Sequence, residues 1–139
     1  MAQARRLLYL DEDLPKRLAT ELNRRGRNAL SVYADEKKGT LDGDLVSMLY
    51  ERFGQDVVLV TANESMPIEH EAVLTATGVA LAVVDGDHGD TPQEAWKRET
   101  VHRWAHLMES QEPGLWRRYS PHRPGRWTRR RRRPSLRVD

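Results

Sequence analysis

The sequence predicts an α/β protein: a three-layer α/β/α sandwich with a central, mainly parallel sheet, followed by a basic C-terminal tail. Short apolar runs of strand length alternate along the chain with segments whose apolar residues recur at helical spacing. This alternation is typical of a parallel sheet whose two faces are covered by helices. The length of 139 residues is enough for one such domain and leaves little chain for a second.

Three apolar runs are the strongest candidates for buried strands. They occupy residues 7–10, 57–60 and 79–84, and acidic or polar residues follow each of them. A short apolar run between polar boundaries is typical of a strand that is covered on both faces. A weaker strand is expected at residues 29–32.

The spacing of apolar residues predicts helices between these strands. Leu14, Leu18 and Leu22 recur every fourth residue, which places them on one face of a first helix. Residues 40–53 and 67–77 show a similar pattern, and a glycine follows each of these two segments. The first three helices are therefore expected to end at glycines.

A fourth helix is expected at residues 91–109, because it opens with a capping box and a proline at its first position. Trp96 and Trp104 lie eight residues apart in it, and we expect both to anchor the helix in the core. Trp116 and Trp127 are interleaved with arginines, a pattern that suits base stacking or cation–π packing.

Charge is divided unevenly along the chain, although the formal net charge is only +2. Residues 1–90 hold 10 Lys and Arg against 16 Asp and Glu, a net charge of −6, whereas residues 91–139 hold 13 against 5, a net charge of +8. An acidic body joined to a basic end suggests metal chemistry in one part and a polyanionic partner for the other.

Two absences exclude whole classes of function. The chain has no cysteine, which excludes disulfide scaffolds, cysteine zinc sites and thiol nucleophiles. It also has no apolar stretch of about 18 residues, so we expect no membrane span, no membrane partner and a cytoplasmic location.

Acidic residues follow the predicted strands at what should be one edge of the sheet. They are Asp11 and Asp13 after the first strand, Glu64 next to Asn63 after a central one, and Asp85 after the last. Functional crevices of open parallel sheets lie at this edge. Gathered carboxylates must be protonated, solvated or neutralised by a cation, and Mg²⁺ and Mn²⁺ prefer oxygen ligands. The pattern favours a metal-dependent nuclease; the alternative is that these acids only solvate loops or cap helices.

Three stretches carry a resemblance to a known family. The run L-Y-L-D-E-D-L-P at residues 8–15 is similar to the L-D-E-N-L-P opening of PIN-like domain proteins. Residues 58–67, V-L-V-T-A-N-E-S-M-P, resemble that family's strand ending in T-x-D-D. Residues 40–45, T-L-D-G-D-L, stand where the family has an acid that opens a helix. The resemblance covers about residues 5–88.

The resemblance implies a nuclease that binds Mg²⁺ or Mn²⁺ through three or four acids, in many cases the ribonuclease toxin of a toxin–antitoxin pair. Asp11 would be the first metal ligand and Asp42 or Asp44 the second acid. Asn63 falls where the family has a third acid and Glu64 where it often has a fourth, so the catalytic candidates are Asp11, Asp42, Asn63 and Glu64. Asp13 and Asp85 complete the set of possible ligands. RNA, an antitoxin and a second copy of the chain in a homodimer would be the partners.

Asn63 departs from the family pattern, because an amide is neutral and binds a divalent ion more weakly than a carboxylate. Glu64 could substitute by a shift of one position, and Asp85 could help. The same loss would mark a non-catalytic PIN-like module that binds RNA or a protein, and this is the alternative function. A phosphoacceptor receiver domain is disfavoured, because Thr61 stands where such a domain has its phosphorylated aspartate.

The C-terminal segment is rich in arginine. Residues 117–139 hold ten arginines and one acid. We expect an α/β core at residues 1–90, a docking segment of the same domain at 91–120 and a disordered tail at 121–139. The tail could bind RNA, bind an acidic surface of the same or another molecule, or only solubilise the chain. The nucleic-acid-binding candidates are Arg117, Arg118, Arg126, Arg129, Arg130, Arg131, Arg132 and Arg133.

Overall fold

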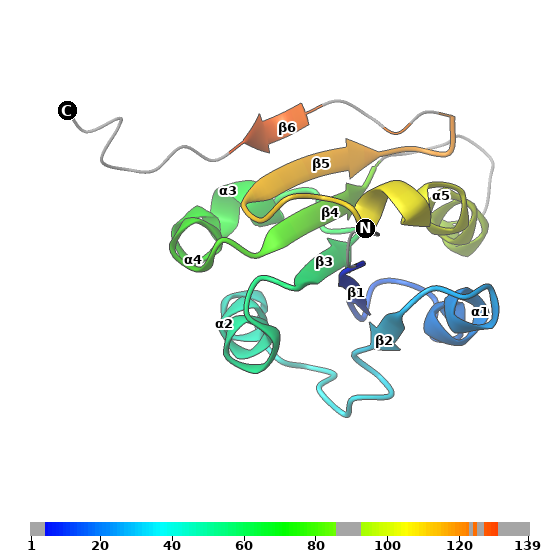
Figure 1. Ribbon diagram of the computed structural model, residues 1–139, viewed down its shortest axis with the longest axis horizontal. Helices are drawn as coiled ribbons and strands as arrows, with labels where there is room; N and C mark the ends of the chain where they lie inside the picture. The colour runs from blue at the N-terminus through cyan, green and yellow to red at the C-terminus, as the bar shows by residue number, and fades with distance from the viewer. Residues whose placement is uncertain (1–4, 86–92, 123, 125–126, 131–139) are drawn as a thin grey trace.

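The computed structural model describes residues 5–85, 93–122, 124 and 127–130, and its centre is a single sheet (Figure 1). Within these residues the sheet has six strands in the order β2-β1-β3-β4-β5-β6. The first five strands along the chain are parallel, and β6 pairs with β5 in the antiparallel direction. The strands are β1 (Leu7–Leu10), β2 (Ala29–Ser31), β3 (Val57–Thr61), β4 (Ala80–Val84), β5 (Leu115–Tyr119) and β6 (Trp127–Arg130).

Helices cover both faces of the sheet, which confirms the predicted three-layer sandwich (Figure 1). One face carries α1 and α5, and the other carries α2, α3 and α4. The helices are α1 (Leu18–Arg24), α2 (Asp42–Phe53), α3 (Met66–Glu69), α4 (Glu71–Thr77) and α5 (Gln93–Met108). No helix in the described part of the chain is long and apolar enough to span a bilayer.

The apolar runs divide their side chains between two cores, because successive residues of a strand point to opposite faces. Leu8 and Val58 pack under α1 and α5, whereas Tyr9, Leu59 and Trp116 pack under α2 and α4. All residues of β3 and β4 are buried. The central strands are therefore covered on both sides, as their uninterrupted apolar sequences predict.

Several elements differ from the sequence-based expectation. The first helix begins at Leu18 because the chain from Asp11 onward forms turns, in which Asp11 O accepts from Leu14 N and Pro15 O accepts from Leu18 N. The predicted helix at residues 67–77 is broken at His70, whose backbone leaves the helical region with φ −123° and ψ 31°.

The C-terminal segment departs further from expectation, because residues 115–119 form a strand. Trp116 and Tyr119 are fully buried, while Arg117 and Arg118 between them are partly exposed. This pattern has no strict alternation, which is why the sequence did not indicate a strand. Trp116 is a core residue, not a base-stacking platform. Residues 127–130 form β6, where a disordered tail was expected, and residues 131–139 lie outside the described part.

Candidate acidic site at the sheet edge

The strand order fixes where a site is expected. In an open parallel sheet ordered 2-1-3-4-5, the chain leaves β1 and β3 toward opposite faces, and a crevice opens beyond their carboxyl ends. The residues that follow β1 begin with Asp11, and those that follow β3 begin with Ala62. The backbone N–H of Asp11 donates to Val60 O at 2.9 Å, which holds the two strand ends side by side.

Asp11 is the most buried carboxylate of this edge, with 6% of its surface exposed. Its Oδ1 accepts a hydrogen bond from Glu12 N at 2.8 Å, and its Oδ2 accepts one from Thr61 Oγ1 at 2.9 Å. Both donors are neutral, so the carboxylate has donors but no direct cationic partner among these contacts.

Asp13 faces the same hydroxyl group from the other side. Its two carboxylate oxygens lie 3.1 Å from Ala62 N, and its Oδ2 lies 3.2 Å from Thr61 Oγ1. The Thr61 hydroxyl carries one hydrogen and also accepts from Asn63 N at 3.1 Å. It can therefore donate to only one of the two carboxylates at a time.

Asp42 reaches the site from the first turn of α2. Its Oδ2 accepts a hydrogen bond from Asn63 Nδ2 at 3.0 Å and lies 3.9 Å from His70 Nε2. Asn63 is held on its other side too, since its Oδ1 accepts from Ser65 N at 3.0 Å. Asn63 thus links the residues after β3 to the start of α2.

Burial has the largest effect on the electrostatics of the site, and neighbouring carboxylates add to it. Burial raises the pKa of Asp11 from 3.8 to about 6. The charge of Asp13 adds to this shift, and that of Asp42 adds less, whereas the hydrogen bonds that Asp11 accepts act against it. Burial also raises the pKa of Asp13, against the hydrogen bonds from Ala62 and Thr61 and the positive charge of Lys97. Negative charge is therefore costly here in the absence of a cation.

Lys97 is a neighbour of the site that the sequence did not indicate. It lies on α5, and its Nζ donates to the backbone oxygen of Asp13 at 2.7 Å. No local pattern could have placed it there, because the contact spans 84 positions and depends on how α5 packs beside α1.

Three other predicted ligands are exposed or follow another strand. Asp44 and Glu64 are exposed. Asp85 follows β4, one strand further along the sheet, and its Oδ2 lies 3.9 Å from Arg118 Nη1. Hydrogen bonds through Thr61 and Asn63 therefore link Asp11, Asp13 and Asp42, whereas Asp44 is exposed.

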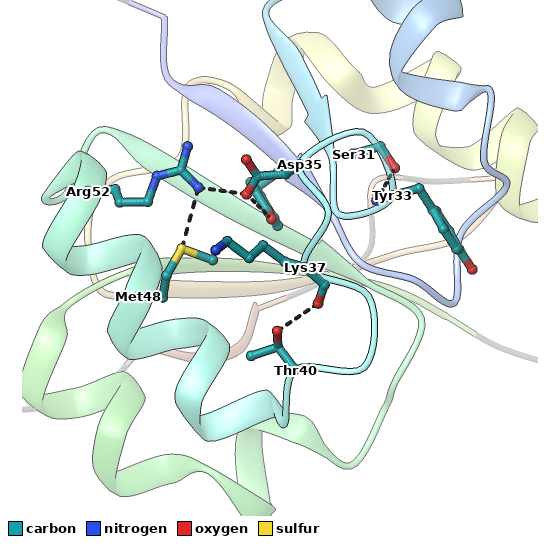
Figure 2. Close-up of polar contacts among 8 residues, drawn as sticks. Ser31, Tyr33, Asp35, Lys37, Thr40, Met48 and Arg52 are labelled. Carbon is teal, nitrogen blue, oxygen red and sulfur yellow. Dashed lines mark hydrogen bonds and ion pairs between the residues drawn. The ribbon is translucent and has the colours of Figure 1, made fainter.

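The loop that precedes Asp42, residues 32–41, is held by hydrogen bonds at two places. At one of them, Asp35 Oδ2 accepts from Arg52 Nη1 at 2.6 Å (Figure 2). The same oxygen accepts from Tyr9 Oη at 2.7 Å. At the other, Tyr33 Oη donates to Glu12 O at 2.6 Å and Gly39 N donates to Glu12 Oε1 at 2.7 Å. These contacts tie residues 32–41 to β1, to α2 and to the turn that holds Asp11 and Asp13.

The side chains present fit a hard divalent cation in atom type and in charge, with Asp11, Asp13 and Asp42 as the residues that would hold it. The two carboxylates that share one hydroxyl group support this. As they stand, however, no three acidic or histidine side chains of the described residues are grouped to hold a metal ion. Asp13 is turned toward Ala62 N and Asp42 toward the Asn63 amide, so protein donors satisfy part of their ligand capacity.

The predicted nucleic-acid-binding arginines are only partly described. The guanidinium of Arg117 lies 5.5 Å from the centre of the Tyr119 ring, and Arg118 lies beside Asp85. Both belong to β5 near the opposite side of the sheet from β1. Arg129 and Arg130 lie in β6. Outside the described residues lie Arg126, Arg131, Arg132 and Arg133.

Comparison of the chain with protein-family models, with curated proteins and with solved structures finds no significant match.

Proposed function

We propose that this protein is a PIN-like, Mg²⁺- or Mn²⁺-dependent endoribonuclease of the cytoplasm. One observation carries the proposal: the carboxylates of Asp11 and Asp13 share the Thr61 hydroxyl at the crevice of the sheet, and Asp42 reaches the neighbouring Asn63 from a separate segment. Perturbed carboxylates in such a crevice are typical of sites that work on a substrate or hold a metal.

Each residue of the site has a defined task in this proposal. Asp11, Asp13 and Asp42 would hold the divalent cation, and Thr61 orients the first two through its hydroxyl group. Asn63 orients Asp42 through its amide. The bound cation would supply a Lewis acid and lower the pKa of a water, which is the chemistry that phosphodiester hydrolysis needs at neutral pH.

A role as the toxin of a toxin–antitoxin pair, with an antitoxin partner and a homodimeric state, belongs to the same proposal. It rests on the resemblance of residues 8–15 and 58–67 to the family. Expression of the chain alone, compared with expression of Asp11→Asn, tests it by growth: only the unaltered chain should arrest the host.

Cleavage of labelled RNA in Mn²⁺ tests the nuclease itself. Asp11→Asn and Asp42→Asn should each lower the cleavage rate by more than about a hundredfold, because each removes a carboxylate that would hold the ion. Asp44→Asn is the matched control, since it removes the same charge from the same helix at an exposed position. Equal rates for the unaltered protein and Asp11→Asn would contradict the proposal.

A second function is favoured by the state of Asn63: a non-catalytic PIN-like module that binds RNA or a protein partner. Both ends of the Asn63 amide are occupied, one by Asp42 and the other by Ser65 N, as in a residue that fixes a loop. Asn63→Asp distinguishes the two functions. RNA cleavage by Asn63→Asp alone would identify a decayed nuclease, whereas cleavage by the unaltered chain would exclude the non-catalytic function.

A further inference from the structure

We propose that a groove between the start of α1 and the first half of α5 binds the sugar–phosphate backbone of single-stranded RNA and leads it to the acidic site. We call it the α1–α5 groove; it has a volume of about 450 Å³, and Lys16, Arg17, Lys97 and Arg98 line it. Asp13 lines it as well, so the groove adjoins the acidic site. The proposal rests on the proposed function, because it names the route of that substrate.

The cations of the groove come from two walls. Lys16 and Arg17 are exposed and lie just before α1, whereas Lys97 and Arg98 lie on α5. Neither Lys16 nor Arg17 forms an ion pair with a carboxylate in the described part of the chain. Two accessible positive charges on one wall and an ammonium group beside Asp13 on the other suit a chain of phosphates.

Three acids also line the groove and offset part of this charge, which leaves four cations against three acids. Glu12 turns its Oε1 toward Gly39 N at 2.7 Å, and Asp13 turns both carboxylate oxygens toward Ala62 N. The third lining acid, Glu94, is exposed on α5. The carboxylates of Glu12 and Asp13 are thus engaged with backbone N–H groups, whereas Lys16 and Arg17 are exposed and lie in no ion pair of the described residues.

An aromatic ring at the groove favours a single-stranded nucleic acid over other polyanions. Tyr33 lines the groove and is only partly buried. The Nζ of Lys16 lies 5.0 Å from the centre of its ring and the Nζ of Lys38 lies 5.9 Å from it. A ring flanked by ammonium groups offers a stacking face for an unpaired base beside contacts for its phosphates.

The test measures binding without cleavage. The full-length chain is titrated into fluorescently labelled oligouridylate in EDTA at several salt concentrations, and fluorescence anisotropy gives Kd. Lys16→Gln/Arg17→Gln is compared with Arg24→Gln/Arg25→Gln, which removes two exposed charges from the other end of α1. Circular dichroism verifies that both variants are folded. The Arg-rich segment is the same in both, so its contribution cancels.

We expect the groove pair to weaken binding by about tenfold or more at low salt and to reduce the slope of log Kd against log salt by about 1.4, or 0.7 for each lost phosphate contact. The control pair should change both quantities much less. Tyr33→Leu should weaken binding further without changing the salt slope, because a stacking contact releases no counterions. Equal losses for the two pairs, or no loss for the groove pair, would overturn the proposal.

The outcome is separable from that of the nuclease. Because the titration contains no divalent cation, a weakened groove pair supports the groove even where Mn²⁺ produces no cleavage. Conversely, Mn²⁺-dependent cleavage with unaltered RNA affinity in the groove pair would uphold the nuclease and overturn the groove.

Discussion

Asp11 and Asp35 are two poorly exposed carboxylates near β1, and their surroundings shift their pKa values in opposite directions. Asp35 accepts from the guanidinium of Arg52 (Figure 2). It also accepts from the hydroxyl of Tyr9. Burial acts to raise the pKa of Asp35, but these two hydrogen bonds and the charge of Arg52 outweigh it, and the pKa is lowered. Asp11 has an N–H and a shared hydroxyl as donors and two acids as neighbours, and its pKa is raised to about 6.

The difference separates a structural carboxylate from one suited to function. Asp35 has its counter-charge within the chain, and it fastens a loop. Asp11 lacks one, which destabilises the folded protein unless a cation comes from outside. A carboxylate whose pKa is strongly shifted by its surroundings is typical of a functional site, although ion-pair networks also shift pKa values. The following predictions test this contrast, from the largest expected effect to the smallest.

Asp11→Asn should stabilise the metal-free protein at pH 7. The folded-state pKa of about 6 exceeds the usual 3.8, so the folded state binds the proton more tightly, and stability falls as pH rises from about 4 to 6. The difference between these two pKa values lowers the free energy of unfolding by up to about 3 kcal/mol at neutral pH. Urea unfolding in EDTA should show this gain at pH 7 and little gain below pH 4. A variant that is less stable than the unaltered chain at pH 7 would refute the contrast.

Mn²⁺ or Mg²⁺ should stabilise the unaltered chain and not Asp11→Asn. A ligand that binds only the folded state adds about 2.7 kcal/mol at one hundred times its Kd. Thermal unfolding followed by circular dichroism across a metal titration measures the effect, with Ca²⁺ as a comparison ion. An identical shift in both proteins would mean that the metal binds elsewhere.

Tyr9→Phe should destabilise the protein by about 1 to 2 kcal/mol, because it removes a donor from Asp35 and leaves a buried ring otherwise intact. The sign of the pH dependence is opposite to that of Asp11. The lowered pKa of Asp35 gives stability above its usual pKa that is lost as the pH falls, so the loss from Tyr9→Phe should shrink in acid. Urea unfolding at pH 7 and pH 3 provides the measurement, and an equal loss at both values would contradict the assignment.

Arg52→Met should have the smallest effect, below about 1 kcal/mol, because its side chain is 39% exposed and water screens the ion pair. Methionine keeps the aliphatic stem that packs along α2. The loss should diminish in 1 M salt, measured by the same unfolding assay. A loss of several kcal/mol that salt does not change would show that the pair acts through packing.

Much of the fold could be predicted, because β1, β3 and β4 are uninterrupted apolar runs and the acids after β1 follow from them directly. Asp11 and Asp13 could be placed at the sheet edge for the same reason. β5 was missed because two arginines interrupt its apolar pattern, and the burial of Trp116 depends on pairing with β4.

The rest of the site depends on contacts that no local pattern contains. The choice between Asp42 and Asp44 depends on where α2 begins relative to Asn63. Lys97 and Tyr33 reach the edge from α5 and from the loop after β2, through contacts that span 84 and 21 positions. The sequence could identify which residue types lie at this edge of the sheet, but not which of their atoms form hydrogen bonds.

The direct pairing of β1 with β3 has a consequence for synthesis of the protein. Neighbouring parallel strands need a crossover connection, so residues 7–10 cannot complete their pairing until residues 57–61 exist. The carboxylates of Asp11 and Asp13 meet the Thr61 hydroxyl only then. A nascent chain therefore has no acidic site until its first 63 residues have left the ribosome.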